Sequence, residues 1–490
     1  MLPYTVSLVV KTAAGQVQGR LVAAGPLRAH AWLGLPYAAP ARGPLRFAPP
    51  APHPGWTGTR RAQTYAPDTL QPLDPSVTLA PSAEGSLALN IWAPAEGQGH
   101  PVLLWFHGGA FRAGSGRLYD GREFAARHGL VVVTVNSRLG PLGYANFGGL
   151  FQDDRFAPNA GYQDQVAALR WVTANIAGFG GDPARITVAG ESAGAVAAAL
   201  MLRDPGAAPL IRGAILQSGT LNQVSSWDNS LEIAQAYADA LGIGRTNVHD
   251  LWGRPPAAFV GALHRLEAVR ARRLNSRPFL DGQVLPRDFA ALLATPAAPV
   301  PLLLGANRDE YSLFVRLPNR IFPRTDRTLL TRVMVPYLAP GQLGAVLAAY
   351  PDTQGGLVAL GTDLFFHSGN DALLRGHAAP AYRYRFDWGT RLFGLGATHG
   401  MELLFLWPRP MGAASALMRG GDARRRAALA HQMQAAWASF VRDGHPGRAW
   451  PAYTEGDPQV ARLDLSGVTL TVGGEHERRR LWTGSFVPMP

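Results

Sequence analysis

A serine stands at the centre of the pentapeptide Gly190-Glu191-Ser192-Ala193-Gly194, between a β-branched run and an alanine-rich stretch that is typical of a helix. Small residues around a serine at a strand-to-helix turn let the chain bend sharply and push the hydroxyl out at the end of a sheet. Activated by a base, the hydroxyl of Ser192 is a candidate nucleophile for acyl transfer. The pentapeptide alone is weak evidence, because a serine before a helix is more often its N-cap.

A second segment predicts backbone donors for the negative charge that develops during acyl transfer. The run His107-Gly108-Gly109-Ala110-Phe111 follows an apolar stretch, and its small side chains let a substrate carbonyl approach the backbone. Gly109 and Ala110, together with Ala193, are three possible N–H donors of an oxyanion hole. Taken alone, a glycine-rich segment after a strand is more often an ordinary turn.

Residue types alone do not choose the general base or the acid that orients it. His399 lies in a glycine-rich loop that can present an imidazole, but His367 and His377 compete with it. Asp309 and Glu310 are equal candidates for the acid, since both follow the same apolar run. The chain order serine, acid, histidine is the one that α/β-hydrolases use.

The elements that must position these residues are apolar runs separated by helical patterns. Continuous apolar strands indicate a sheet that is buried on both faces and therefore mostly parallel. The alternation predicts the α/β class, with a doubly wound central sheet, long cap-like insertions and ligands bound beyond the carboxyl ends of the strands. The expected strands lie at 102–106, 130–135, 186–188, 214–216, 301–304 and 382–386, and the expected helices at 162–177, 193–203 and 427–442.

Composition limits the chemistry further. The 490 residues contain no cysteine, which excludes disulfides, thiolate metal sites and a cysteine nucleophile. The 13 histidines form no metal-ligand spacing, and Lys11, the only lysine, lies outside any phosphate-binding loop. We therefore expect no metal and no other cofactor. Since no linker or internal repeat interrupts the chain, we expect one domain over residues 1–490.

The formal net charge of +12 comes almost wholly from scattered arginines, and one run of three is Arg424-Arg425-Arg426. A second run of three arginines stands at Arg478-Arg479-Arg480. This distribution is typical of a solvated surface and leaves nucleic-acid binding as a minor alternative. Because the first residues lack a basic segment and their apolar stretch is interrupted at Lys11, we expect neither a signal peptide nor a membrane span. The expected protein is cytoplasmic, a monomer or small homo-oligomer, with no nucleic-acid or membrane partner.

These motifs belong to a pattern that extends almost end to end. The chain resembles the type-B carboxylesterase and cholinesterase family, an α/β-hydrolase family, and is most similar to its bacterial para-nitrobenzyl-esterase-like members. Many spaced motifs in the same order carry this resemblance: Gly34 to Ala38, Arg46-Phe47, Leu89 to Trp92, His107 to Phe111, Asn136 to Gly140, Asn159-Ala160-Gly161 with Asp164-Gln165, Phe179 to Pro183, and Gln217-Ser218-Gly219.

The resemblance implies a serine carboxylesterase that hydrolyses short- to medium-chain or aryl esters through an acyl-enzyme on Ser192. It selects Glu310 as the acid and His399 as the base, and it assigns the oxyanion donors to Gly109, Ala110 and Ala193. Ser218 and Glu191 are expected to support this triad by contact. The pairs Arg46 with Glu84 and Arg138 with Asp164 match structural ion pairs of the family.

Three departures from the family pattern are informative. Ser86 stands where the family has a cysteine, so the usual disulfide is absent, in accord with a reducing compartment. The segment 65–83 has no tryptophan, so the aromatic platform that binds choline by cation–π contact is missing. Tyr311 follows the acid where the family has a small residue, and it would be strained if that position requires a positive φ.

The expected substrate is a small-molecule ester, and several apolar side chains are expected to surround it. Amide, carbamate, thioester or lactone hydrolysis by the same machinery is the first alternative, because fold does not decide substrate. A non-catalytic binding paralogue is the least favoured, since every triad position is filled. The pocket candidates are Phe111, Leu313, Phe314, Phe366 and Leu395, with Phe365 and Phe393 nearby in sequence, and at least half of these residues are expected to be ordinary core.

Overall fold

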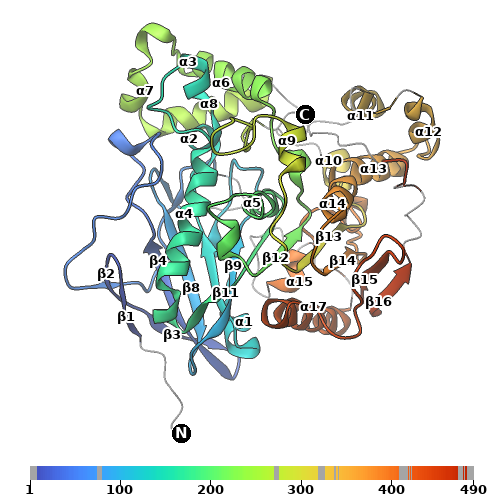
Figure 1. Cartoon of the computed structure of the whole chain (residues 1–490), viewed down its shortest axis with the longest axis horizontal. Coiled ribbons are helices and arrows are strands. Elements are labelled where there is room, and N and C mark those ends of the chain that lie inside the picture. Colours follow the sequence, from blue (N-terminus) through green and yellow to red (C-terminus); the bar gives the residue numbers. More distant parts are fainter. Residues whose placement is uncertain are drawn as a thin grey trace.

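A central sheet of eleven strands runs through the protein (Figure 1). This computed structural model describes residues 8–73, 80–269, 275–317, 326–335, 338–339, 341–407, 418, 420, 422–472, 478 and 480–482. The strand order is β16-β15-β14-β13-β12-β11-β9-β10-β8-β4-β3. Neighbouring strands from β10 to β15 are parallel, whereas the strands at both edges are antiparallel. The prediction of a mostly parallel α/β sheet is confirmed.

All six strands expected from apolar runs lie in this sheet, although β11 is longer than the run that predicted it. The sheet consists of β3 (Arg20–Ala24), β4 (Leu27–Pro36), β8 (Ala88–Pro94), β9 (His100–Phe106), β10 (Val131–Val135), β11 (Gly181–Glu191), β12 (Gly213–Gln217), β13 (Leu302–Asn307), β14 (Ala381–Phe386), β15 (Gln459–Asp464) and β16 (Gly467–Val472). Two small sheets combine β1 (Val9–Thr12), β2 (Gly15–Gln18) and β5 (Thr59–Arg61), and β6 (Asp68–Thr69) with β7 (Ser82–Ala83).

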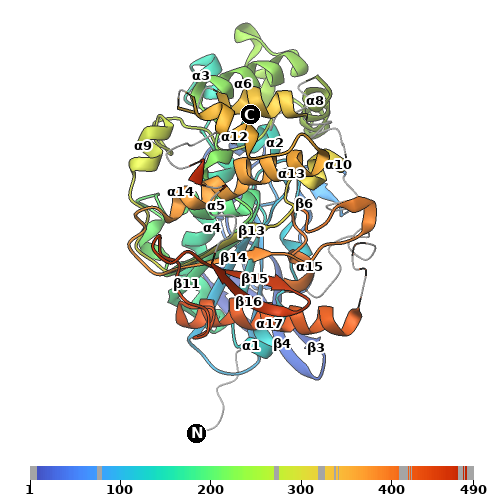
Figure 2. The same ribbon diagram turned by 90° about the vertical axis from the view of Figure 1, so that its right-hand side faces the viewer.

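Helices cover both faces of the sheet, as Figures 1 and 2 show. On one face lie α4 (Ala160–Asn175) and α5 (Ala193–Met201), and on the other lie α1 (Arg122–His128) and α17 (Ala423–Asp443). Strand β9 shows why both layers form, since Leu104 packs into one apolar cluster and Leu103 into the other. Successive side chains of a strand point to opposite faces, so a continuous apolar run buries both.

Two helical insertions interrupt the alternation, between β12 and β13 and between β13 and β14. Each carries an apolar cluster of its own, separate from the two that flank the sheet. The first insertion contains α6 (Trp227–Leu241), α7 (Asp250–Gly253), α8 (Pro256–Val269) and α9 (Phe289–Ala294). The second contains α10 (Ser312–Arg316), α11 (Arg327–Met334), α12 (Gln342–Ala348), α13 (Gln354–Thr362), a π-helix (Asp363–His367) and α14 (Ser368–Leu374). The short helices α2 (Gly140–Tyr144), α3 (Phe147–Phe151) and α15 (Leu403–Leu406) complete the described set.

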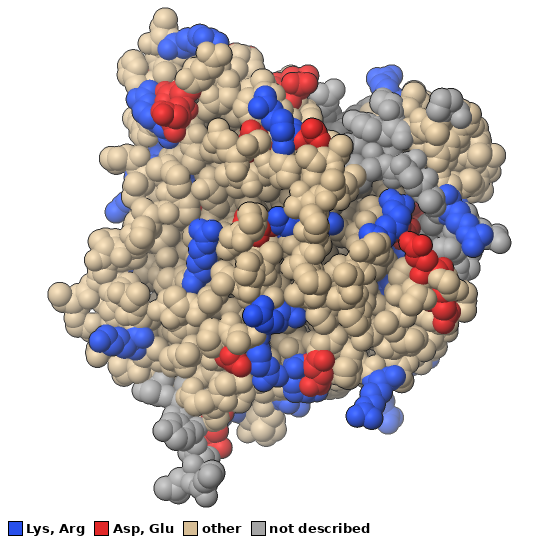
Figure 3. All heavy atoms as spheres, in the orientation of Figure 1, with Lys and Arg blue, Asp and Glu red and all other residues tan. Residues whose placement is uncertain are grey.

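The ion pairs expected from the resemblance form in the structure. Arg46 and Glu84 are 2.5 Å apart, and Arg138 and Asp164 are 2.6 Å apart, with all four side chains buried. Elsewhere, basic and acidic side chains are dispersed over the face shown in Figure 3, and that face carries no large patch of one sign. None of the described helices combines the length and apolarity needed to span a lipid bilayer.

Candidate active site

Ser192 occupies a sharp turn between the end of β11 and the start of α5. Its backbone has φ 53° and ψ −121°, a conformation that side chains rarely adopt and that surrounding contacts must stabilise. The N–H of Ser192 donates to the carbonyl of Gln217, 2.8 Å away at the end of the neighbouring strand β12. The turn therefore holds the serine at the carboxyl edge of the sheet.

The small residues around Ser192 are sterically necessary. A Cβ atom on Gly190 would lie 2.4 Å from the carbonyl carbon of Gly194, and one on Gly194 would lie 2.0 Å from the carbonyl oxygen of Phe106. Real Cβ atoms do not approach so closely, so the strand, the turn and the helix can meet only if both positions are glycine. The absence of side chains at Gly190 and Gly194 is therefore what allows the turn to form.

His399 and Glu310 are in direct contact. Nδ1 of His399 lies 2.6 Å from Oε2 of Glu310, whose side chain is fully buried. The other carboxylate oxygen, Oε1, accepts hydrogen bonds from the hydroxyl of Ser218 at 2.5 Å and from the N–H of Asn307 at 2.6 Å. With every side of the carboxylate occupied, Glu310 can hold the imidazole in one orientation.

The competing candidates make other contacts. Oδ2 of Asp309 accepts from Arg308 and from the N–H of Ala397, 2.9 Å away. Nε2 of His377 lies 2.9 Å from the carbonyl of Val300. His367 is buried within the π-helix. Of the two acids that the residue types left open, the structure brings Glu310 to the imidazole.

The predicted oxyanion segment forms a tight turn against Ser192. A Cβ atom on Gly108 would lie 3.3 Å from Cβ of Ser192. Gly109, Ala110 and Phe111 all have positive φ, at 115°, 54° and 56°. Among the described residues, the N–H groups of Gly109, Ala110 and Ala193 have no protein acceptor. Such unpaired donors beside a nucleophile are what an oxyanion hole requires.

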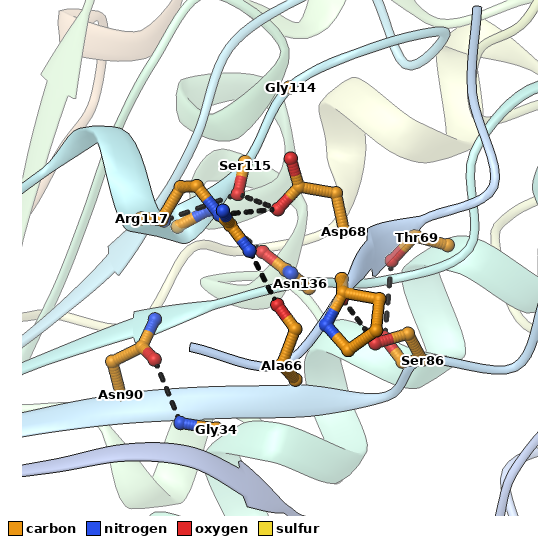
Figure 4. Close-up of polar contacts among 12 residues, drawn as sticks. Gly34, Ala66, Asp68, Thr69, Ser86, Asn90, Gly114, Ser115, Arg117 and Asn136 are labelled. Carbon is orange, nitrogen blue, oxygen red and sulfur yellow. Dashed lines mark hydrogen bonds and ion pairs between the residues drawn. The ribbon is translucent and has the colours of Figure 1, made fainter. Parts of the chain in front are cut away.

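A network of buried polar side chains anchors the chain just after this turn (Figure 4). Asp68 is fully buried, accepts from the hydroxyl of Ser115 at 2.5 Å and pairs with Nε of Arg117 at 3.0 Å. Gln71 exchanges two hydrogen bonds with the backbone of Gly114, at 2.7 and 2.8 Å. Asn136 accepts from the N–H of Gly116. The sequence analysis assigned no contact to Asp68, Gln71 or Ser115, and it named Asn136 only as the start of the motif Asn136 to Gly140.

Comparison with known proteins places the chain in a family. The model of the carboxylesterase family matches residues 6–482. The chain belongs to the carboxylesterase family. It is a carboxylic ester hydrolase, which confirms the expectation from the sequence motifs.

Among curated relatives, the chain is 34% identical to the para-nitrobenzyl esterase of Bacillus subtilis (strain 168), covering 92% of this chain and 94% of that one. It is 32% identical to human cocaine esterase, covering 93% and 87%. Among solved structures, a thermophilic PNB esterase aligns with a TM-score of 0.87 at 32% identity, covering 96% and 99%. A carboxylesterase of Geobacillus stearothermophilus aligns with a TM-score of 0.82 at 32% identity, covering 97% and 100%. The hydrolase fold is therefore shared over nearly the whole chain.

In this carboxylesterase, the charges of three carboxylates act on one imidazole. Besides Glu310, Oε1 of Glu191 lies 3.3 Å from Nε2 of His399. Burial alone lowers the pKa of His399, but the charges of Glu191 and Glu310 outweigh it and raise the pKa to about 9. Burial raises the pKa of Glu191 to about 8, against the opposing effect of His399. The site thus favours the charged imidazolium, which must form when a serine hydroxyl loses its proton to the base.

The third carboxylate belongs to Glu402, which the sequence reasoning missed. Its oxygens accept from the side-chain amides of Gln217 at 3.1 Å and of Asn307 at 2.6 Å. Burial, together with the charge of Glu310, raises the pKa of Glu402 to about 7. Glu402 ties the loop of His399 to the ends of β12 and β13. Glu402 lies only three residues after His399, and this closeness in sequence was a signal that could have identified it.

Two of the expected pocket residues pack against the imidazole. The rings of Phe314 and Phe366 are stacked, with centroids 6.5 Å apart, and lie 5.8 Å and 5.2 Å from the ring of His399. Phe111 is buried against Tyr144, at a centroid distance of 4.9 Å. The rings of Phe314 and Phe366 therefore give His399 an apolar neighbourhood on one side.

The remaining candidates differ in exposure. Leu395 is buried, and its carbonyl accepts from the hydroxyl of Ser312, whereas Leu313 is half-buried. Phe365 is buried against Tyr311, at a centroid distance of 5.4 Å. Phe393 is 67% exposed, so its ring faces solvent. Their roles toward a substrate stay predictions.

Tyr311 is not strained, because its position does not require the positive φ on which strain would depend. It has φ −77°, an ordinary helical value, at the start of α10. Its ring packs on Gly361, where a Cβ atom would lie 2.1 Å from Cδ1 of the tyrosine. A missing side chain on α13 thus compensates for the large residue beside Glu310.

Proposed function

We propose that the enzyme is a serine carboxylesterase that works through an acyl-enzyme on Ser192. His399 accepts the proton of the hydroxyl as the oxygen attacks the ester carbonyl. Glu310 orients the imidazole and stabilises its charged form. The N–H groups of Gly109, Ala110 and Ala193 stabilise the tetrahedral oxyanion. The observation that carries the proposal is the 2.6 Å contact of His399 with Glu310, whose second oxygen is held by two donors.

The later steps reverse these roles. The imidazolium of His399 protonates the departing alcohol, which completes the acyl-enzyme. A water molecule, deprotonated by the same imidazole, then attacks the acyl carbonyl and releases the acid. Glu191 and Ser218 support the triad, Glu191 by its charge beside Nε2 of His399 and Ser218 by its hydrogen bond to Glu310. No step requires a metal or another cofactor.

The proposed substrates are neutral short- to medium-chain or aryl carboxylic esters. The relatives named para-nitrobenzyl esterase and cocaine esterase support an aryl component. The apolar rings beside His399 support an apolar acyl group, because each buried CH₂ contributes about 0.8 kcal/mol. Amide, carbamate, thioester and lactone hydrolysis share the same machinery and are the alternative. A panel of chromogenic esters of increasing acyl length, with choline esters beside neutral isosteres, should show an optimum at short to medium length and no preference for choline.

Replacement and covalent labelling of Ser192 test the mechanism. Ser192→Ala should lower kcat on an aryl ester by about 10⁴-fold or more, since triad members act as a unit. An organophosphate or a sulfonyl fluoride should modify Ser192 stoichiometrically, as read by peptide mass spectrometry. An adduct on another serine, with Ser192 unmodified and activity lost, would refute the assignment.

The setting of the enzyme is also part of the proposal. A chain without cysteine suits the reducing cytoplasm, where we propose that the enzyme acts. We propose a monomer or small homo-oligomer, which light scattering during size-exclusion chromatography would distinguish from larger assemblies.

A further inference from the structure

The oxyanion turn carries unusual backbone strain. Ala110 and Phe111 are consecutive residues with side chains, and both have positive φ, at 54° and 56°. Glycine adopts such angles freely, but other residues do so only where the surrounding structure holds them. Contacts around this turn must therefore stabilise the positive φ angles of Ala110 and Phe111, because the local sequence does not favour them.

One of these contacts comes from a distant part of the chain. Arg112 directly follows the strained pair, and its Nε lies 2.5 Å from Oε1 of Glu267, 155 residues away on α8. A second contact joins Nη2 of Arg112 to Oε2 of Glu267 at 3.4 Å. The side chains are only 9% and 3% exposed. The pair therefore links the turn to a helix of the first insertion.

The backbone transmits this link to the candidate donors. The N–H of Arg112 donates to the carbonyl of Gly109 at 3.1 Å, and Ala113 donates to the same carbonyl at 3.1 Å. A movement of Arg112 would therefore act directly on the peptide unit that joins Gly109 to Ala110, which carries the Ala110 N–H, and through it on the rest of the turn. Helix α8 is itself held firmly, since its buried Phe259, Leu263 and Leu266 belong to the apolar cluster of the first insertion.

We propose that the ion pair of Arg112 and Glu267 positions the oxyanion turn, so that helix α8 sets the placement of the Gly109 and Ala110 N–H groups. The inference rests on the proposed function, which assigns these groups to the oxyanion. Arg112 and Glu267 are positioning residues, because they act on the backbone of the turn and not on the substrate. Breaking this buried pair removes one fixed anchor of the turn.

The test is a double-mutant cycle on a p-nitrophenyl ester, with Arg112→Met, Glu267→Gln and the double variant. A displaced oxyanion donor weakens transition-state binding more than substrate binding. Each single change should lower kcat about tenfold or more, with KM within about threefold of the unaltered enzyme. The double variant should lose no more than the worse single variant, because one shared interaction is broken once.

Glu84→Gln is the matched control. It removes the carboxylate of another buried ion pair, with the same 2.5 Å separation, whose arginine Arg46 contacts the first insertion through the carbonyls of Leu251, Trp252 and Arg254. This control should lower the melting temperature while kcat stays within about twofold. A trifluoromethyl ketone, which forms a tetrahedral adduct, should lose affinity in the Arg112 and Glu267 variants and not in the control.

The outcomes separate this inference from the proposed function. If both single variants keep kcat within twofold while Ser192→Ala is inactive, the positioning role is overturned and the mechanism stands. If Ser192→Ala stays active, the proposed function fails instead. If the single variants do not fold, Arg112→Lys is the deciding variant. Lysine keeps the positive charge but replaces the planar guanidinium, which contacts both carboxylate oxygens of Glu267, with a point charge. A loss of kcat of about threefold at unchanged KM then supports the role, and an unchanged kcat overturns it.

Discussion

Replacing Glu191 with glutamine should shift the pH dependence of hydrolysis. His399 must be neutral to accept the proton of Ser192, so kcat/KM falls as the pH drops through the pKa of His399. Burial lowers that pKa, but the charges of Glu191 and Glu310 raise it to about 9, above its ordinary value of 6.5. Removing one of these charges destabilises the imidazolium. The acid limb should therefore move to lower pH in Glu191→Gln.

The size of the shift follows from the geometry. Oε1 of Glu191 and Nε2 of His399 are 3.3 Å apart. Coulomb's law at that separation is worth about 1.3 kcal/mol in a water-like dielectric and about 5 kcal/mol at an effective dielectric of about 20. At about 1.36 kcal/mol per pKa unit, the range is about 1 to 4 units. Burial raises the pKa of Glu191 itself to about 8, so this carboxyl is partly neutral over the acid limb. A downward shift of about 1 unit is expected.

The assay is kcat/KM for p-nitrophenyl acetate from acid to alkaline pH, read at the isosbestic point of the product and corrected for spontaneous hydrolysis. Glu123→Gln is the control, because this glutamate lies on the outer helix α1 in an exposed pair with Arg127. Its acid limb should coincide with that of the unaltered enzyme. An unchanged limb in Glu191→Gln, or a shift to higher pH, would show that Glu191 does not act on the base through its charge.

Three further predictions follow from the site. Glu310→Gln should lower kcat by about 10³-fold or more, whereas Asp309→Asn should cost less than about tenfold, because the Glu310 carboxylate is the one in contact with the imidazole; equal losses in steady-state kinetics would contradict this. Gly194→Ala should destabilise the fold by about 3 kcal/mol or prevent folding, since its Cβ would lie 2.0 Å from the carbonyl oxygen of Phe106; an unchanged denaturant midpoint would refute the steric argument. Prolonged dialysis against EDTA should leave activity unchanged, and a loss that added zinc or calcium restores would reveal a metal site.

The local features of this protein were encoded in short stretches of sequence. The continuous apolar runs predicted six strands of the central sheet, because a strand buried on both faces has no polar side to interrupt it. The turn at Ser192 was equally local, since Gly190 and Gly194 determine by their size whether strand and helix can meet. The antiparallel strand β3 was not foreseen, because its apolar residues do not alternate with polar ones: Leu21 and Ala23 are exposed, whereas Val22 and Ala24 are buried.

The partners across the site were decided by tertiary structure. Asp309 and Glu310 are neighbours in the sequence and carry the same charge. Only Glu310 contacts the imidazole of His399, which lies 89 residues further along the chain. The family resemblance named Glu310, whereas the residue types alone left both open. Reach of this kind depends on how β13 and the loop of His399 are placed against each other, which no local pattern encodes.

The same reason explains the features that the sequence did not reveal. Tyr311 fits only because Gly361 leaves room for its ring on another helix. Glu267 contacts Arg112 across 155 residues of chain. Short-range periodicity and steric size determine elements and turns, whereas contacts between distant elements depend on the packed arrangement of the whole chain. The sequence therefore determined six strands of the central sheet and the bend at Ser192, and the tertiary structure decided which charges act on His399 and which contacts hold the turn at Gly109 to Phe111.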